Sequence, residues 1–391
     1  MAPLGPWDAA RRVAVAVSGG ADSLALAVLA RAWGDAVALI VDHGLRASSA
    51  AEAEQTRAVL AGLGMPARVL TLTGLHAGPG LAARARAARY AALTTACREA
   101  GLVDLLVGHH AGDQVETVLM RSRRGSGTGG LAGMAALVEA DAIRLLRPLL
   151  AAPPSRLRTT LRAAGLGWVE DPTNADLRTT RARLRAELGG DLALVPVARR
   201  NGVARAAAER GAAAELAERV RIYPEGYAVL TPGPIGAPAL AMLLRTISGG
   251  RLPVPAASVA ALARAPGPAT LAGVRILQAG RIGPGWLLVR EFAAIAPPVA
   301  WRAGLVWDGR FRAVGEAAAG ATLGALGADA ARFRALSPLP AAILRTLPAI
   351  RCDSALSQVP HLAYASSLSR IGGSVVRNAA LPVCGAPFVV S

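Results

Sequence analysis

Apolar and polar residues fall into alternating blocks over the first hundred positions, and these blocks predict strands separated by helices. The expected strands are short apolar runs at 13–17, 36–41, 68–72 and 105–107. The expected helices are longer stretches at 22–33, 49–63 and 81–100. Ser49 and Glu52 have the spacing of a capping box at the start of the second helix. Buried strands joined by helices predict right-handed crossovers, and hence a doubly wound, mainly parallel α/β sheet.

The chain has 391 residues, which is too long for one ordinary domain. A helical stretch at 156–165 is followed by a charged helical region at 178–220. Apolar runs then mark a middle segment, and Pro297-Pro298 forms a linker to a last segment that begins near Trp301. We therefore expect the α/β domain to be followed by two smaller C-terminal domains.

The turn Ser18-Gly19-Gly20-Ala21-Asp22-Ser23 joins the first expected strand to a helix. Its glycines let the backbone turn sharply and approach a ligand closely. The serine hydroxyls and the unpaired N–H groups that open the helix can bind an anion. A carboxylate such as Asp22 suits this site only if a Mg²⁺ ion bridges it to phosphate. The turn therefore predicts a phosphate site with Asp22 as the magnesium ligand, and a plain serine–glycine turn is the alternative.

Two more polar segments follow strands of the same expected sheet, where ligands of such sheets gather. Asp42 and His43 close the second strand, and the segment 108–117 follows the fourth. Adjacent histidines in that segment do not face the same way on a helix, and a zinc site usually needs three or four protein ligands. We therefore favour a loop near the substrate and Mg²⁺ over a zinc site.

A basic, glycine-rich segment at 121–130 contains a formal GxGxxG pattern. It follows a helix and does not join a strand to a helix, so the dinucleotide-binding interpretation is rejected. We expect a flexible loop that handles phosphate or closes over the site, with an ordinary surface loop as the alternative.

Arginine supplies all 43 basic residues, and the chain contains no lysine. The net charge of +17 favours a polyanionic partner, above all nucleic acid, although a basic proteome with GC-rich codons would give a similar composition. The absence of lysine excludes a Walker A loop, a protein kinase of the usual type and Schiff-base chemistry. If ATP binds, arginine and a metal ion must neutralise its phosphates.

Hydrophobic residues make up 53% of the chain, but much of this is alanine. We expect no membrane span and no signal peptide, because no apolar run is long enough and the first residues lack an apolar core. Cys97, Cys352 and Cys384 are scattered, which argues against a disulfide framework, a zinc ribbon or an iron–sulfur cluster. We therefore expect a cytoplasmic location.

A series of motifs, in this order, resembles the tRNA(Ile)-lysidine synthetase family of PP-loop (N-type ATP pyrophosphatase) enzymes. They are SGGxDS at 18–23, HGLR at 43–46, ARxxRY at 85–90, HHxxDQxET at 109–117, RGSGxxGLxGM at 124–134, RPLL at 147–150 and EDxTNxD at 170–176. The resemblance is strong over about residues 10–190 and weaker beyond. It implies a fold like that of the adenine nucleotide alpha hydrolases. The implied domains are a PP-loop ATP-binding catalytic domain (1–190), a helical connector (191–221) and two tRNA-binding domains (222–296 and 299–391).

The resemblance implies a ligase that forms a carbon–nitrogen bond. ATP would adenylate the C2 carbonyl oxygen of the wobble cytidine in tRNA(Ile) with a CAU anticodon. Free L-lysine would then displace AMP to form lysidine, so AMP and pyrophosphate are released. By resemblance, catalysis is assigned to Asp22, Asp113, Glu116 and Arg86. ATP binding is assigned, with Mg²⁺ on Asp22, to Ser18, Gly19, Gly20, Ala21, Asp22, Ser23, Asp42 and His43. Substrate or tRNA contacts are assigned to His109, His110, Arg124, Asp171, Asn174, Arg181 and Arg185.

The chain departs from the family pattern at two positions. Gly112 stands where the family commonly has an aspartate, and Ala182 stands where it often has asparagine. The lost carboxylate makes Asp113 the stronger candidate for metal and substrate. A tRNA thiolase of the same superfamily and a non-catalytic tRNA-binding relative are the alternatives, although thiolases commonly need paired or catalytic cysteines near the site. A homodimer is compatible with the sequence, which does not define the oligomeric state.

Overall fold

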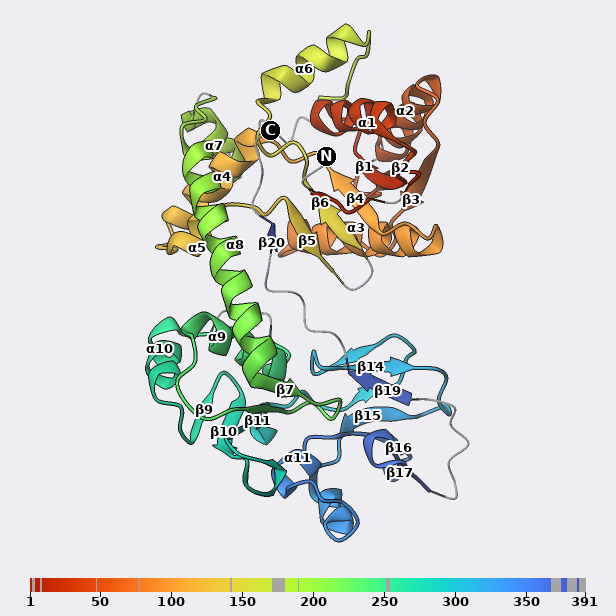
Figure 1. Ribbon diagram of the computed structural model, residues 1–391. Coiled ribbons are helices and arrows are strands. Elements are labelled where there is room, and N and C mark those ends of the chain that lie inside the picture. The colour runs from red at the N-terminus through yellow and green to blue at the C-terminus, as the bar shows by residue number, and fades with distance from the viewer. Residues whose placement is uncertain are drawn as a thin grey trace. The chain divides into compact units, whose positions relative to one another are not determined.

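The structure is a computed structural model (Figure 1). It describes residues 1, 4–7, 9–46, 48–76, 78–140, 143–170, 180–188, 190–250, 254–366, 374–377 and 385–386. The chain divides into two compact units, residues 1–207 with 384–391 and residues 208–383. In the described part of the chain, we find no helix with the length and apolar character needed to cross a bilayer.

The first unit is built on a seven-stranded sheet with the order β20-β5-β6-β4-β1-β2-β3. Its strands are β1 (Val13–Val17), β2 (Ala36–Asp42), β3 (Ala67–Thr71), β4 (Asp104–Val107), β5 (Leu137–Glu139), β6 (Arg144–Leu146) and β20 (Gly385–Ala386). Strands β3, β2, β1, β4 and β6 are parallel. Strand β5 runs opposite to them, and β20 pairs antiparallel with β5. The expected doubly wound, mainly parallel sheet is confirmed.

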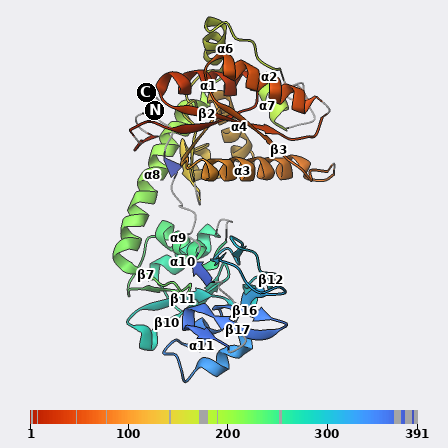
Figure 2. The ribbon, with the colours of Figure 1, turned by 90° about the vertical axis from the view of Figure 1, so that its right-hand side faces the viewer.

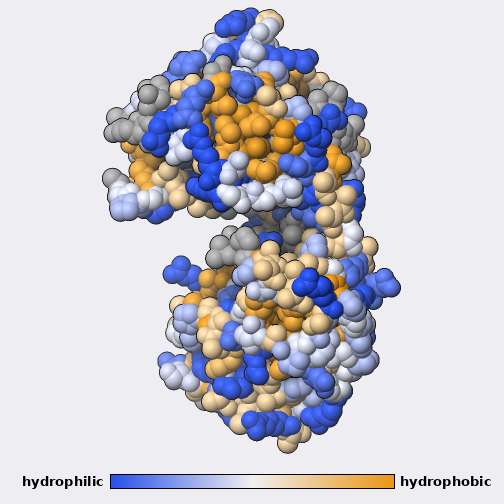
Figure 3. Space-filling view, turned by 90° about the vertical axis from the view of Figure 1, so that its left-hand side faces the viewer, coloured by the Kyte–Doolittle hydropathy of each residue, from blue (hydrophilic) through white to orange (hydrophobic). Residues whose placement is uncertain are grey.

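Helices cover both faces of this sheet, which explains why its central strands are apolar throughout (Figure 2). The helices are α1 (Ala21–Trp33), α2 (Ser49–Gly62), α3 (Leu81–Glu99), α4 (Ala111–Ser122), α5 (Thr128–Leu131), α6 (Pro154–Ala163), α7 (Thr180–Leu188) and α8 (Leu194–Arg219), the last of which continues into the second unit. Val13 and Val15 pack into the core with α1 and α6, while the intervening Ala14 packs with Leu93 of α3. Apolar surface is not confined to the interior, because one face of this unit carries an apolar patch bordered by hydrophilic residues (Figure 3).

The expected capping box of α2 is wrong. Ser48, not Ser49, is the N-cap residue, and no side chain caps the helix. The Ser49 hydroxyl instead donates to Asp42 Oδ1 at 2.6 Å, and the Ser48 hydroxyl donates to Glu52. Asp42, at the end of β2, therefore accepts the hydrogen bond of the Ser49 hydroxyl, which the local spacing had assigned to capping of the helix. The segment 121–130, expected as a loop, contains the start of the short helix α5.

The second unit contains three antiparallel sheets. The first, ordered β7-β8-β11-β10-β9, consists of β7 (Val220–Ile222), β8 (Ala228–Leu230), β11 (Trp286–Arg290), β10 (Val274–Gln278) and β9 (Ala269–Leu271). The second, ordered β12-β15-β16-β17-β18, consists of β12 (Val299–Ala300), β15 (Thr322–Ala325), β16 (Pro348–Cys352), β17 (Ala355–Val359) and β18 (Tyr364–Ala365). The third consists of β13 (Val306–Trp307), β14 (Phe311–Val314) and β19 (Ser374–Arg377).

Helices α9 (Ala237–Ser248) and α10 (Ala256–Arg264) pack on the first of these sheets, and α11 (Ala341–Leu344) lies before β16. The short 3-10 helices are η3 (Gly280–Ile282), η4 (Phe292–Ala294), η5 (Gly327–Phe333) and η6 (Pro360–Leu362). Both expected C-terminal domains begin in this unit, whereas residues 384–391 of the last one belong to the first unit, and the domain boundaries stay predictions.

A buried carboxylate links the middle and last segments of the second unit. Asp308, in the turn between β13 and β14, accepts hydrogen bonds from Arg290 of β11 and from Arg310. It also accepts from the backbone N–H of Ala296 at 2.9 Å. The Asp308 and Arg310 side chains are 3% and 1% exposed, so this is an ion-pair cluster in the interior.

Candidate active site

The turn after β1 is held in shape by its own serines. The Ser23 hydroxyl accepts from the backbone N–H of Ser18 and donates to the Gly20 carbonyl, both at 3.0 Å. The hydroxyls of Ser18 and Ser23 are 3.1 Å apart. Gly19 has φ +83°, and a Cβ there would lie 2.5 Å from Thr56 Oγ1 of α2. Only glycine fits at this position, for reasons of conformation and of space.

The same turn leads directly into α1, whose first N–H groups are free of any capping side chain. Gly20 is the N-cap residue and makes no side-chain cap bond. The N–H groups at the start of a helix have no partner within the helix, and the helix dipole adds positive potential there. The geometry therefore fits an anion such as a phosphate group at the carboxyl end of β1.

The end of β4 lies directly against this turn. A Cβ on Gly108 would lie 3.0 Å from the Asp22 carbonyl oxygen and 3.1 Å from the Ser23 Cα. Glycine at this position therefore permits the close approach of two segments that are 85 residues apart in sequence. This approach brings His110, which follows β4, beside Asp22.

His110 caps helix α4 and reaches Asp22. Its Nδ1 accepts from the N–H groups of Gly112 (3.0 Å) and Asp113 (3.4 Å), and Asp113 Oδ2 accepts from the His110 N–H, which completes a capping box. Its Nε2 lies 3.4 Å from Asp22 Oδ2. Burial lowers the pKa of His110, but the hydrogen bond to Asp22 and the charges of Asp113 and Asp22 outweigh it, so the pKa is raised.

Gly112, where the family commonly has aspartate, makes room for this imidazole. A Cβ at position 112 would lie 2.9 Å from His110 Cε1 and 3.2 Å from its Nδ1. A larger side chain would therefore push the ring away from the helix end. In this chain, glycine in place of the family's aspartate at position 112 therefore allows His110 to occupy the helix end.

Asp113, Glu116 and Arg185 form a charged group on helices α4 and α7. Arg185 donates to the buried Glu116 Oε1 through Nε at 2.9 Å, and its Nη2 lies 2.8 Å from the same oxygen. Its Nη2 is also 3.8 Å from Asp113 Oδ1. Because Asp113 also lies 3.8 Å from His110 Nε2, these side chains continue directly from the Asp22 turn. The structure thus brings together the turn, both histidines, both carboxylates and Arg185.

A second, basic group surrounds His109. Arg147, itself 9% exposed, donates from Nε to His109 Nδ1 at 3.3 Å and from Nη1 to the Ala135 carbonyl. Burial and the charge of Arg147, with smaller contributions from Arg86 and Arg89, lower the pKa of His109 to about 4. Arg86 and Arg89 both lie over the ring of Tyr90, at 5.0 and 5.3 Å. Several arginines near a neutral imidazole make this end of the sheet suitable for phosphate.

The predicted ATP contacts at the end of β2 are placed in a tight turn. Asp42 Oδ1 accepts from the Gly44 N–H at 2.9 Å and from the Ser49 hydroxyl, and these hydrogen bonds hold its pKa below the ordinary value. His43 is partly buried, and burial together with Arg89 lowers its pKa. Asp42 therefore shapes the turn, and the assignment of both residues to ATP stays a prediction.

Gln114 lies in the segment 108–117, and the sequence pattern did not identify it as a site residue. It is 0% exposed, donates to the Met134 carbonyl at 2.9 Å and accepts from the Met134 N–H at 2.6 Å. Arg121 adds hydrogen bonds to the carbonyls of Gly130 and Gly133. These contacts fix the glycine-rich segment to α4. The presence of both the HHxxDQ and the GLxGM motifs in one chain was the available indication of this role. No local sequence pattern indicates that the two motifs are in contact.

The remaining predicted residues are placed as follows. Arg124 is exposed in the turn after α4, and Arg86 is exposed on α3. Asp171 and Asn174 lie outside the described residues, as does the side chain of Arg181 on α7. Their roles in catalysis or substrate contact stay predictions.

The residues present fit a magnesium ion shared with phosphate. Mg²⁺ is usually held by one or two carboxylates together with substrate phosphates. The Asp22 side chain is 39% exposed beside the helix N-terminus, and Oδ2 of Asp22 and Oδ2 of Asp113 both lie within 4 Å of His110 Nε2. In the ranges that the structure describes, no three His, Cys, Asp or Glu side chains are arranged as a metal site of their own. Asp22 would therefore hold the ion only together with a bound nucleotide.

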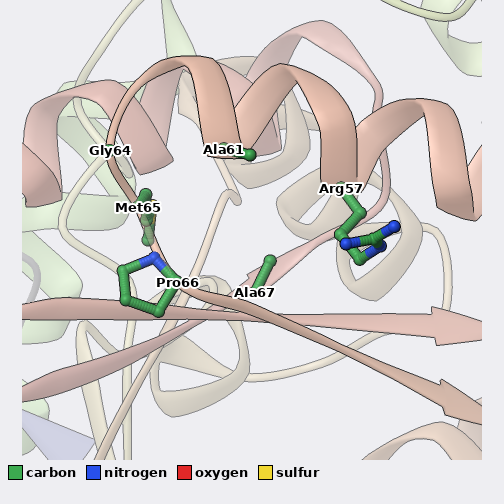
Figure 4. Close-up of a pocket in the computed structure, with 6 residues that line it drawn as sticks. All are labelled: Arg57, Ala61, Gly64, Met65, Pro66 and Ala67. Carbon is green, nitrogen blue, oxygen red and sulfur yellow. The ribbon is translucent and has the colours of Figure 1, made fainter.

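A pocket of about 320 Å³ lies at the amino end of strand β3 (Figure 4). It is lined by Arg57, Ala61, Gly64, Met65, Pro66 and Ala67, between the end of α2 and the start of β3. Ligands of parallel sheets gather at the carboxyl ends of the strands. This pocket lies at the amino end of β3, so it does not belong to the site described above, which lies at the carboxyl ends of the strands.

Comparisons with known proteins show which proteins this chain is similar to. A family model described as the PP-loop domain matches residues 2–192. The chain is 47% identical over 186 residues to tRNA(Ile)-lysidine synthase of Rhodopseudomonas palustris, which covers 46% of this chain and 54% of that protein. It is 36% identical over 347 residues to the enzyme of the same name from Ruegeria pomeroyi, which covers 81% and 80% of the two chains.

The matched part spans little more than half of some relatives and most of others. It spans 58% of the tRNA(Ile)-lysidine synthase of Bradyrhizobium diazoefficiens. Among solved structures, the U34-tRNA thiolase NcsA from Methanococcus maripaludis with its 4Fe-4S cluster is similar over 51% of this chain and 74% of that chain, at 17% identity and a TM-score of 0.42.

Proposed function

Because the chain belongs to the tRNA(Ile)-lysidine synthase family, we propose that it joins lysine to C2 of the wobble cytidine of tRNA(Ile) with a CAU anticodon. ATP is cleaved to AMP and pyrophosphate, and the tRNA is adenylated before lysine attacks. The observation that carries this proposal is the contact between Asp22 in the phosphate turn and His110 at the head of α4. This contact joins the proposed anion site at the 18–23 turn to the carboxylates of α4, at the carboxyl ends of the strands of one sheet.

The first step needs a better leaving group on the base. The C2 carbonyl oxygen of cytosine leaves poorly, and adenylation converts it into the oxygen of AMP. The turn at 18–23 and the N–H groups of α1 would hold the phosphates, and Asp22 would hold Mg²⁺ against them. Held there by Asp22, Mg²⁺ would neutralise charge on the departing pyrophosphate. The basic group around His109 supports binding of the tRNA backbone beside this site.

The second step needs a neutral amine close to the activated base. Asp113 and Glu116 are acceptors that would attract and orient the lysine ammonium group, and one carboxylate would take its proton. Arg185 Nη2 lies 2.8 Å from Glu116 but 3.8 Å from Asp113, so Asp113 is the less strongly neutralised carboxylate and the better candidate for the base. The anticodon loop is single-stranded, so presenting the wobble base to the pocket costs little.

A direct assay tests the function. The protein is incubated with ATP, Mg²⁺, labelled lysine and a tRNA(Ile) transcript with a CAU anticodon, and label in RNA is counted. We expect incorporation into this transcript, little into tRNA(Met) and one AMP for each lysine. AMP release without label in RNA would point to another nucleophile, and equal labelling of tRNA(Met) would contradict the substrate assignment.

Matched variants sharpen this assay. Asp22→Asn and Asp113→Asn should each lose most of the activity, because each removes a carboxylate charge from the proposed site. Asp35→Asn is the control, because Asp35 is exposed just before β2, at the amino end of that strand. Full activity of Asp22→Asn would contradict its proposed role with magnesium.

Cys97 does not support the thiolase alternative. Cys97 lies on α3 and is buried in the core, and burial raises the pKa of its thiol to about 11. A thiol with such a pKa is a poor nucleophile at neutral pH.

A further inference from the structure

The segment from Leu166 to Glu170 lies against the backbone of the phosphate turn. The backbone N–H of Val169 donates to the Gly19 carbonyl at 3.0 Å. A Cβ on Gly19 would lie 3.6 Å from Val169 Cγ2, and one on Gly20 would lie 3.9 Å from the Val169 carbonyl oxygen. We call residues 166–170 the strap. The strap therefore contacts both glycines, and Thr56 of α2 lies closer still to Gly19, 2.5 Å from its Cβ position.

The strap is anchored independently of the turn. The N–H of Leu166 donates to the Leu161 carbonyl at the end of α6, and Leu166 and Trp168 pack against the core of the first unit. Trp168 Nε1 donates to Glu170 Oε1 at 2.6 Å, and Arg162 of α6 lies 5.9 Å from the Trp168 ring centre. The strap can therefore hold the turn without being held by it.

The bond from Val169 determines where an adjacent N–H points. In a trans peptide the carbonyl and the next N–H point in opposite directions. When Val169 holds the Gly19 carbonyl, the N–H of Gly20 faces away from the strap. The next carbonyl, that of Gly20, is held by the Ser23 hydroxyl and the Leu24 N–H, so the N–H of Ala21 is fixed in the same way.

Glycine makes such a restraint necessary. Gly19 lies at φ +83° and has no side chain to limit rotation of the peptide that follows it. If this peptide rotated, a carbonyl oxygen would face the phosphates and would repel them. The hydrogen bond from Val169 opposes this rotation before any ligand arrives, so the cradle is formed in advance.

We infer that Val169 is a positioning residue for the pyrophosphate cradle, acting through its backbone N–H on the Gly19 carbonyl. The inference rests on the ATP-binding part of the proposed function. It assigns to the strap the orientation of the donors that meet the β- and γ-phosphates, and not the binding of adenine or ribose.

An amide-to-ester substitution at position 169 tests this. Incorporating 2-hydroxyisovaleric acid in place of Val169 removes the N–H and keeps the side chain. We expect affinity for pyrophosphate and for Mg·ATP to fall about tenfold, as befits loss of one donor–acceptor contact. The affinity for AMP should change less than twofold. Val169→Ala keeps the N–H and should bind all three ligands nearly as the wild type does.

Two outcomes would overturn the inference. One is an ester variant that binds pyrophosphate like the wild type. The other is an equal loss of pyrophosphate and AMP affinity, which would indicate general distortion of the site. Hydrogen exchange in the wild type covers the case in which the ester variant does not fold: the Val169 N–H should exchange slowly without ligand and more slowly with pyrophosphate, and rapid exchange in both states would contradict its role.

This test is separate from that of the ligase activity. If the wild type binds Mg·ATP and pyrophosphate but transfers no lysine to tRNA, the proposed function fails while the role of Val169 is still decided by these affinities.

Discussion

His110 Nε2 lies 3.4 Å from Asp22 Oδ2, while the other ring nitrogen accepts hydrogen bonds from the first N–H groups of α4. The two contacts together define the tautomer. Because Nδ1 accepts, the proton of the neutral ring is on Nε2 and points at Asp22. One side chain therefore fixes a helix end and orients the carboxylate that we propose for magnesium.

Variants of His110 should separate these two roles. His110→Ala removes a helix cap, which typically costs about 1 kcal/mol, so the melting temperature of the first unit should fall by about 2–4 °C. His110→Asn retains a capping oxygen but is too short to reach Asp22. We expect it to melt near the wild-type temperature and to form AMP about tenfold more slowly, an effect of about 1.4 kcal/mol on the barrier. Calorimetry and an AMP-release assay measure the two quantities. An Asn variant with wild-type AMP formation would show that the contact with Asp22 is not used.

The charge of His109 should be absent throughout the neutral pH range. Its pKa lies near 4, below the ordinary value of 6.5, because of burial and Arg147. On acidification the unfolded chain therefore takes up this proton before the folded chain does, so His109 reduces stability as pH falls from 6.5 to about 4. Above pH 6.5 it contributes nothing to the pH dependence.

Side-chain NMR of His109 checks this directly. The imidazole signals should stay those of the neutral ring down to about pH 5, and Arg147→Met should move the titration to higher pH because a neighbouring positive charge is lost. Arg156→Met, at an exposed position on α6, is the control and should leave the titration unchanged. Titration of His109 near pH 6.5 in the wild type would contradict the burial and charge that we describe.

Gln114 should hold the glycine-rich segment in place. Gln114→Ala leaves the N–H and carbonyl of Met134 without their partner, and each unsatisfied buried group costs about 1–3 kcal/mol. We expect a loss of about 2–4 kcal/mol in urea unfolding and faster tryptic cleavage after Arg123 and Arg124. Gln55→Ala, on the exposed side of α2, should change stability by less than about 0.5 kcal/mol.

The sequence predicted the parallel sheet because buried strands and helices differ in length and spacing. Strand β1 begins and ends where the valine run does, and the polar segments after β1, β2 and β4 lie together because parallel strands end at one edge. The capping box was wrong because Asp42, seven residues before Ser49, takes its hydroxyl. His110 was assigned to the substrate and not to a helix cap, since histidine is an uncommon N-cap residue.

Other parts of the site depend on contacts that no local pattern contains. Arg147 meets His109 across 38 residues, Arg185 meets Glu116 across 69, and Val169 meets Gly19 from beyond α6. Each of these pairs joins segments whose order in the sheet must be known first. The motif spacing indicated which residues belong to the site, but only the fold shows which of them touch.

The Asp308 cluster should stabilise the second unit more than any surface ion pair. Asp308→Ala leaves the buried Arg310 without its carboxylate, and burial already lowers the pKa of this guanidinium to about 10. Breaking a buried pair typically costs about 3–5 kcal/mol. Asp329→Ala is the comparison. The Asp329 side chain is 36% exposed and pairs with Arg351, so its loss should cost at most about 1 kcal/mol. Hydrogen exchange of peptides from β11 and β14 measures both effects within this unit. Asp308→Leu combined with Arg310→Met should regain part of the loss, because the more deeply buried guanidinium is then removed, while Arg290 keeps its bond to the Gly273 carbonyl. Equal protection in the two single variants would mean that the cluster contributes no more than an exposed pair.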